Sequence, residues 1–157
     1  MRVGIGYDIH RLGPGRTLVL GGVTLPGETG LAGHSDADVV LHAVIDALLG
    51  AAALGDIGTH FPADDPEWKD ARSFTLLERT LALVRDAGHA VENVDVTVIA
   101  ERPRLAPHVT AMRARMAELT GVSESAVSVK ATTNEGIGDI GRGEAIAAVA
   151  VALLREA

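Results

Sequence analysis

The sequence contains no cysteine and few aromatic residues, and each scarcity excludes a class of protein. Without cysteine, the 157-residue chain can form neither disulfides nor thiolate metal sites. Aromatic residues make up 3% of the chain and its net charge is -7, so it lacks the basic, aromatic surface that binds nucleic acid. No uncharged apolar run reaches about 18 residues, the length that spans a membrane. We expect a cytoplasmic protein with neither a nucleic acid nor a membrane partner.

Hydrophobic residues make up 47% of the chain, enough for the core of one domain over residues 1–157. Alternating or β-branched stretches predict strands at Arg2–His10, Thr17–Val23, Val91–Ala100, Val127–Thr133 and Glu144–Leu154. Turns are expected at Leu12–Arg16 and Leu25–Glu28. Helical periodicity predicts a helix after an N-cap at Ser35 or Asp36, and others at Ser73–Ala87 and His108–Leu119. The expected fold class is α+β, a single-domain sandwich of one mixed four-stranded sheet with helices on one face.

The first strand carries two potential metal ligands on one face. Asp8 and His10 are two residues apart, so both point away from the face that holds Val3, Ile5, Tyr7 and Ile9. His42, on the following helix, is the candidate third ligand. Two nitrogens and one oxygen suit a zinc ion with an open fourth position, which is the catalytic pattern. An Asp-x-His sequence at a strand end is also common without a metal.

His42 has acidic residues one helical turn away on either side, at Asp38 and Asp46. A carboxylate in such a position can hold the second ring nitrogen of a histidine ligand and so orient the ring. An exposed polar helix face would give the same spacing, and the sequence leaves both interpretations open.

Three further segments have the composition of binding loops. Gly55–Pro66 is a long connection rich in glycine, proline and acids, which indicates a binding loop or a lid. Glu101–Pro107 has two prolines and two arginines at a strand end and could face an anion or form a solvated turn. In Lys130–Gly138, hydroxyls and a lysine could bind phosphate, and Glu135 could bind a hard cation such as magnesium.

Motifs along the whole chain resemble the 2-C-methyl-D-erythritol 2,4-cyclodiphosphate synthase family of the non-mevalonate isoprenoid pathway. The matching segments are Gly6–His10, His34–Asp38, Leu41–Ala43, Asp46–Ala52, Gly55–Gly58, Phe61–Pro62, Asn93–Thr97, Lys130–Thr133 and Gly141–Glu144. The resemblance implies a lyase that cyclises 4-diphosphocytidyl-2-C-methyl-D-erythritol 2-phosphate. The 2-phosphate attacks the β-phosphorus of the diphosphate, and CMP leaves.

The resemblance also implies roles for individual residues. Asp8, His10 and His42 would bind Zn²⁺, and Glu135 would hold Mg²⁺ or Mn²⁺ on the substrate diphosphate. His34 and Thr133 would be the catalytic residues that stabilise the transition state. The implied substrate-binding residues are Ser35, Asp56, Ile57, Gly58, Phe61, Pro62, Ala63, Asp64, Asp65, Ala100, Glu101, Arg102, Pro103, Arg104, Leu105, Ala106, Thr132, Asn134 and Arg142.

The family's assembly implies a homotrimer whose active sites lie between subunits. Family members can also hold an isoprenoid diphosphate on the trimer axis near Arg142. Asp139 stands here where many members have an aromatic residue, which puts that ligand in doubt. Two other function classes remain open: a zinc-dependent phosphohydrolase, which would use the same metal ligands on water, and a non-catalytic trimeric ligand-binding protein.

Overall fold

A computed structural model describes residues 1–157 and contains one mixed sheet of five strands in the order β2-β1-β5-β3-β4. The strands are β1 (Arg2–Leu20), β2 (Val23–Leu31), β3 (His89–Ile99), β4 (Val127–Thr132) and β5 (Ala145–Glu156). Only β3 and β4 are parallel; the other neighbours are antiparallel. The α+β class is correct, but the prediction of a four-stranded sheet was wrong by one strand.

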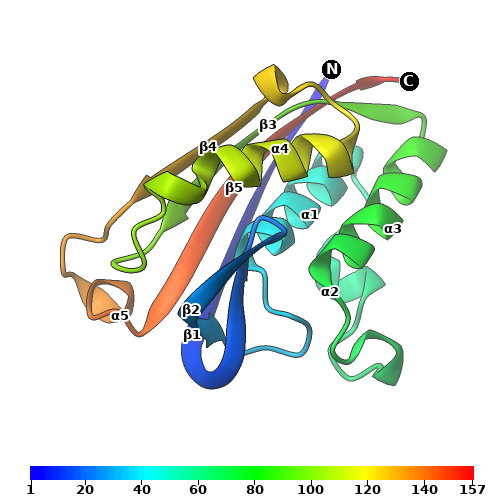
Figure 1. Cartoon of the computed structure of the whole chain (residues 1–157). Helices are drawn as coiled ribbons and strands as arrows, with labels where there is room; N and C mark the ends of the chain where they lie inside the picture. The colour runs from blue at the N-terminus through cyan, green and yellow to red at the C-terminus, as the bar shows by residue number, and fades with distance from the viewer.

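Helices cover one face of this sheet, as the sequence predicted (Figure 1). The helices are α1 (Val39–Ala52), α2 (Ile57–His60), α3 (Ser73–Asp86), α4 (Val109–Thr120) and α5 (Gly138–Gly141), with short 3-10 helices at Pro66–Trp68, Ala106–His108 and Glu124–Ala126. α1 lies across β1 and β5, and α3 packs against α1. None of these helices combines the length and the apolar composition needed to cross a membrane.

Two glycines of β1 let α1 approach the sheet at the level of its backbone. A Cβ atom built on Gly6 would lie 1.9 Å from the carbonyl oxygen of Ala43, and one on Gly4 would lie 2.0 Å from that of Ala47. Real carbon and oxygen atoms do not come this close, so only glycine fits at either position. The same strand continues to Asp8 and His10, and the same helix carries His42, so this close contact sets the distance between the predicted ligands.

The predicted turn at Leu12–Arg16 was wrong, because β1 continues without interruption to Leu20. The chain reverses instead at Gly21 and Gly22, whose φ angles are +60° and +74°. A two-residue hairpin turn with positive φ at both positions strongly favours glycine. Therefore Thr17–Leu20 belongs to β1, and the turn expected at Leu25–Glu28 lies inside β2.

The opposite face of the sheet is uncovered in the single chain, and its β1 and β5 part is apolar. Val3, Ile5 and Tyr7 of β1 are 68%, 71% and 55% exposed, and Ile9 is also exposed. Val151 of β5 pairs with Ile5 and extends this stripe across the neighbouring strand. Several adjacent large apolar side chains on one face are typical of a surface that another protein surface covers.

Candidate active site

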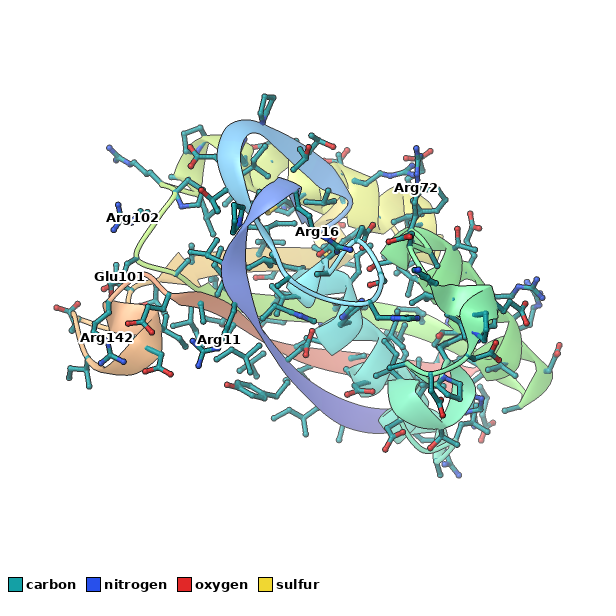
Figure 2. The ribbon with its side chains drawn as sticks, turned by 90° about the horizontal axis from the view of Figure 1, so that it is seen from below. Arg11, Arg16, Arg72, Glu101, Arg102 and Arg142 are labelled. Carbon is teal, nitrogen blue, oxygen red and sulfur yellow. The ribbon has the colours of Figure 1, made fainter.

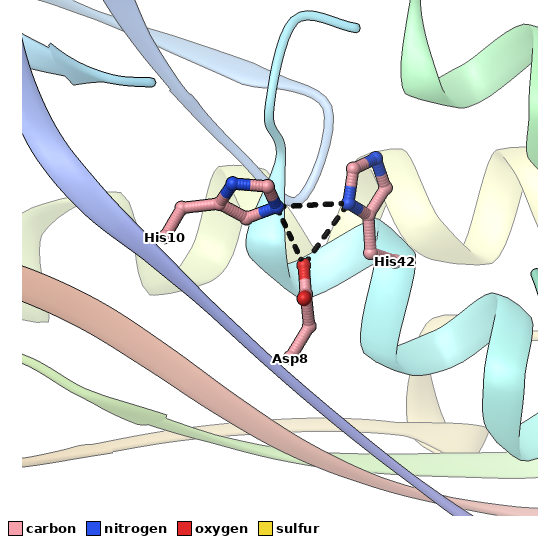
Figure 3. A group of neighbouring side chains, drawn as sticks. All are labelled: Asp8, His10 and His42. Atoms are coloured by element: carbon pink, nitrogen blue, oxygen red, sulfur yellow. Dashed lines mark hydrogen bonds and ion pairs between the residues drawn. The ribbon is translucent and has the colours of Figure 1, made fainter. Parts of the chain in front are cut away.

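Asp8 and His10 of β1 meet His42 of α1 in a compact cluster (Figure 3). Asp8 Oδ2 lies 2.9 Å from His10 Nε2 and 3.0 Å from His42 Nδ1, and the two nitrogens are 3.3 Å apart. Side-chain exposures of 26%, 19% and 12% leave the cluster open on one side. Two imidazole nitrogens and a carboxylate oxygen on rigid elements form a candidate metal site.

Hydrogen bonds determine the protonation of His10 and Asp8. The carbonyl oxygen of Ala32 lies 2.7 Å from His10 Nδ1 and can only accept, so Nδ1 carries a proton. His10 Nε2 donates to Asp8 when the ring is protonated and has a lone pair for a cation when the ring is neutral. Burial would raise the pKa of Asp8, but hydrogen bonds with His10 and His42 outweigh it and hold that pKa well below its usual value. The hydrogen bond to Asp8 in turn raises the pKa of His10. Asp8 is therefore an anion in the folded protein.

Neither Asp38 nor Asp46 hydrogen-bonds to the ring of His42, so the hypothesis that one of them orients the ring was wrong. His42 Nε2 lies instead 3.1 Å from Ser35 Oγ and 3.0 Å from Ser73 Oγ. Asp46 Oδ1 accepts the backbone N–H of Ile57 at 2.7 Å and so fixes the start of α2. Burial raises the pKa of Asp46.

Asp38 is the N-cap of α1, a role that the sequence assigned to Ser35 or Asp36. Its Oδ1 accepts N–H groups from Val40 and Leu41, and its two oxygens also accept those of Gly21 and Gly22 at 2.9 and 2.7 Å. The side chain is fully buried. Asp38 therefore joins the β1–β2 turn to the start of the helix that carries His42.

We expect the stability of the wild type relative to the Asp38→Asn variant to fall as the pH rises. Burial raises the pKa of Asp38 from 3.8 to about 6, so the stabilisation by its neutral form is complete below pH 3.8 and is lost as the pH passes about 6. The change amounts to at most ~3 kcal/mol. Urea unfolding of both proteins between about pH 4 and pH 7 measures it. A difference that does not vary with pH would contradict this assignment.

A cavity of about 290 Å³ opens beside the candidate metal site. Besides the three ligands, it is lined by predicted site residues from two loops, which are His34, Ser35, Ile57, Gly58, Phe61 and Ala63. Trp68 and Leu76 also line it, and sequence reasoning missed both. The Phe61 and Trp68 rings meet edge to face with their centroids 5.0 Å apart. The long loop thus gives the cavity an apolar wall next to a polar floor of imidazoles.

A second cavity, of about 330 Å³, shares no lining residue with the first. Predicted site residues from two segments form its walls, together with Ala131: they are Ala100, Glu101, Pro103, Arg104, Leu105, Ala106, Thr132 and Thr133. Glu101 Oε1 accepts the backbone N–H of Asn134 at 2.9 Å and so anchors the following loop. Within that loop, Thr133 Oγ1 donates to Glu135 Oε1 at 3.3 Å.

Other predicted substrate residues lie outside both cavities. Arg102 lines a third cavity of about 190 Å³, with Glu28 and Gly143 among its neighbours. Figure 2 shows Glu101, Arg102 and Arg142 at the same end of the molecule. Arg142 forms ion pairs with Asp139 and with Glu144, and the hydrogen bond to Glu144 raises its pKa.

Two acidic residues of the long loop, Asp56 and Asp65, are the N-caps of short helices. Asp56 is the N-cap of α2, where its carboxylate accepts the backbone and hydroxyl protons of Thr59, both at 2.8 Å. The Thr59 hydroxyl is the main cause of the lowered pKa of Asp56. Asp65 caps the turn that presents Trp68. Pro62 and Asp64 contribute to neither cavity wall.

Residues 1–155 match the YgbB family. The 2-C-methyl-D-erythritol 2,4-cyclodiphosphate synthase of Symbiobacterium thermophilum is 59% identical over 154 residues, which are 98% of each chain. The synthase of Salinibacter ruber is also 59% identical, over 157 residues and the whole of both chains. Both comparisons cover nearly the whole chain.

Solved structures of related synthases superimpose closely on this fold. The bifunctional IspDF from Campylobacter jejuni superimposes with a TM-score of 0.96 at 40% identity, covering 99% of this chain and 42% of that one. IspF of Plasmodium falciparum, in a CDP complex, gives 0.85 at 34% identity and covers 99% and 96%. The chain therefore belongs to the YgbB family, and its activity is that of a 2-C-methyl-D-erythritol 2,4-cyclodiphosphate synthase, a lyase of isoprenoid biosynthesis.

Proposed function

We propose that the chain performs this cyclisation at a composite site. The candidate metal ligands Asp8, His10 and His42 (the metal cluster) come from one subunit, and the second cavity described above (the nucleotide cavity) comes from a neighbouring one. The substrate is 4-diphosphocytidyl-2-C-methyl-D-erythritol 2-phosphate, and its 2-phosphate attacks the β-phosphorus while CMP leaves. Attacking group, target and leaving group are all anionic. Catalysis therefore depends on positioning and charge neutralisation, and no protein nucleophile is required.

The observation that carries the proposal is the donor set of Asp8, His10 and His42. One ionised carboxylate and two imidazole nitrogens converge within hydrogen-bond distance of one another, and the neutral ring of His10 has a lone pair for a cation. This set fits Zn²⁺ with one position left for a substrate oxygen. When bound there, the ion would supply a positive charge that polarises a phosphate.

The residues around the cluster hold the phosphates in place. His34 and Ser35 line the same cavity as the candidate metal ligands, so they can donate hydrogen bonds to a phosphate seated there. Thr133 and Glu135 lie in the loop that follows β4, and Thr133 would donate a hydrogen bond to the transferring phosphate. Glu135 is exposed and would hold Mg²⁺ or Mn²⁺, which would neutralise negative charge on the substrate diphosphate.

The two cavities suit the two ends of this substrate. Ile57 and Phe61 offer apolar contact to the methylerythritol carbons, and the exposed carboxylate of Asp56 can accept from a hydroxyl. The second cavity, of about 330 Å³, is large enough for a cytosine ring. Known structures of two relatives carry CDP, which is consistent with a cytidine nucleotide in that cavity.

A homotrimer accounts for two features that a monomer leaves unexplained. The first is the separation of the metal cluster from the nucleotide cavity, which share no lining residue. The second is the stripe of Val3, Ile5, Tyr7, Ile9 and Val151 on the uncovered sheet face. Packing three such faces around an axis would bury the stripe and bring one subunit's cluster beside its neighbour's nucleotide cavity.

Phosphorus NMR of the purified protein with substrate, zinc and magnesium tests the reaction, with a chelated sample as control. We expect CMP and a cyclic diphosphate, and the loss of both upon chelation. CMP accompanied by a linear product would show that water is the attacking group and would favour the phosphohydrolase. No turnover by the metal-loaded protein would leave only the ligand-binding alternative.

Subunit mixing tests the composite site. A His42→Ala chain lacks a functional cluster, and an Arg104→Glu chain places a negative charge in the wall of the nucleotide cavity. Mixed trimers should regain activity, because some of their interfaces combine an intact cluster with an intact nucleotide cavity. Activity should be absent from either variant alone. Verified mixed trimers without recovery would place the whole site within one chain.

A further inference from the structure

The ring of His42 has a second nitrogen, Nε2, on the side away from Asp8 and His10. Two hydroxyls lie next to this nitrogen, Ser73 Oγ at 3.0 Å and Ser35 Oγ at 3.1 Å. Ser73 begins α3 and is fully buried. A hydroxyl can either donate or accept, so these contacts alone do not determine which ring nitrogen carries the proton.

Asp36 determines the direction of the Ser73 hydrogen bond. Its Oδ1 makes a short hydrogen bond with Ser73 Oγ, and its Oδ2 accepts the Ser73 backbone N–H at 3.0 Å. A carboxylate has no proton to give, so the hydroxyl proton of Ser73 points to Asp36. Ser73 Oγ then has only a lone pair for His42, and His42 Nε2 must be the donor.

We propose that Asp36 and Ser73 are positioning residues, which together keep the Nε2–H of His42 directed at Ser73, so that Nδ1, 3.0 Å from Asp8 Oδ2, is the nitrogen that offers its lone pair to a cation. For His10, the carbonyl of Ala32 accepts the N–H of the second ring nitrogen directly, without an intervening side chain. Histidine ligands generally donate their second N–H to an oxygen acceptor, which fixes the ring and makes the ligand nitrogen more basic. The proposal rests on the proposed zinc site and adds the two residues that orient its helical ligand.

Ser35 has a different hydrogen-bond environment. Its Oγ accepts the backbone N–H of Ala37 at 3.1 Å, and no carboxylate holds its proton. Since Ser73 already accepts from His42, the hydroxyl proton of Ser35 is available to a phosphate in the cavity. The two serines therefore have different roles: Ser73 orients the ring of His42, and Ser35 can donate a hydrogen bond to substrate.

The hydrogen bonds from Asp36 through Ser73 to His42, called the relay below, are not the only contacts between residues 34–36 and residues 70–73. The backbone N–H of Asp70 donates to the His34 carbonyl at 2.9 Å, and that of Asp36 donates to the Ala71 carbonyl at 3.1 Å. Arg16 also donates to the Ser35 carbonyl at 2.5 Å. These contacts persist in a Ser73→Ala variant, so we expect that variant to fold.

Zinc affinity, measured by competition with a chromogenic chelator, tests the relay without reference to turnover. Ser73→Ala and Asp36→Asn should each weaken zinc binding about tenfold, the lower end of the effect usual for residues that support a metal ligand. The double variant should be no weaker than the single variants, because both interrupt one chain of hydrogen bonds. Ser125→Ala is the matched control, since its exposed hydroxyl contacts only Ser123.

Nitrogen-15 NMR of the zinc-loaded protein supplies a second readout. His42 Nε2–H should give a slowly exchanging proton signal in the wild type and in Ser125→Ala, and this signal should be lost in Ser73→Ala. A merely structural role for Ser73 would leave the signal in place. If Ser73→Ala did not fold, the nearly isosteric Asp36→Asn variant would decide.

Two results would overturn the relay: zinc affinities of both variants within twofold of the wild type, or losses that multiply in the double variant. Failure of the wild type itself to bind zinc would be a different result. It would remove the proposed zinc site, and the relay with it.

Discussion

Replacing His42 by alanine should abolish cyclisation and leave the purified protein with little zinc. The substitution removes one of three ligands, and Asp8 and His10 alone would not retain the ion. Since a bound cation contributes several kcal/mol to stabilising charge on a phosphate, turnover should fall roughly a thousandfold or more. Metal content by atomic emission and CMP release under saturating substrate measure the two effects.

The matched control is His89→Ala, at the start of β3 and outside the walls of the two cavities proposed to bind substrate. It removes the same ring from the chain and should retain zinc and activity. Normal zinc content together with normal turnover in His42→Ala would refute the assignment of the metal cluster. A folded His42→Ala protein, verified by circular dichroism, excludes global unfolding as the cause of the loss.

Replacing Gly6 by alanine should destabilise the fold by more than about 3 kcal/mol, beyond the usual cost of overpacking a core. The added Cβ would lie 1.9 Å from the Ala43 carbonyl oxygen, which is a backbone atom of α1 and cannot rotate away. The helix would have to move off the sheet. Any protein that still folded should bind zinc weakly, because His42 would move with the helix away from Asp8.

Gly50→Ala is the control for this prediction. Gly50 lies on the exposed side of α1, and a Cβ there meets no atom within 4 Å. Alanine is the better helix former by about 1 kcal/mol, so this variant should be slightly more stable than the wild type. Chemical denaturation compares both variants with the wild type. A Gly6→Ala protein of wild-type stability would mean that α1 can separate from β1 at little cost.

The sequence predicted that Asp8, His10 and His42 lie together, because their geometry follows from two regular periods. In a strand, Asp8 and His10 must share a face, and a helix packed on that face brings His42 above them. The positions of the hairpin turn were not predictable in the same way. Gly13, Pro14 and Gly15 are typical turn residues, yet they lie at an irregularity in the pairing of β1 with β2, where a strand bends without ending.

The environment of His42 shows why contacts between distant segments were missed. Helical spacing placed Asp38 and Asp46 near His42, but Asp38 turns to the free N–H groups at the helix start, as a short acidic side chain prefers. The actual partner, Ser73, is 31 residues away in the chain. Trp68 likewise reaches the cavity only through the fold of its loop, although a single tryptophan among acidic loop residues was a usable signal.

The alternation along β1 has a consequence for how this gene can change. Tyr7 and Ile9 point to the uncovered face, and Asp8 and His10, their immediate neighbours, point to the metal cluster. Deleting or inserting a single codon between Gly6 and Asp8 would exchange the two sets, turning the ligands outward and the apolar side chains toward α1. Substitutions can therefore alter the apolar face and the candidate metal site separately, whereas a change in the length of this segment would disrupt both at once.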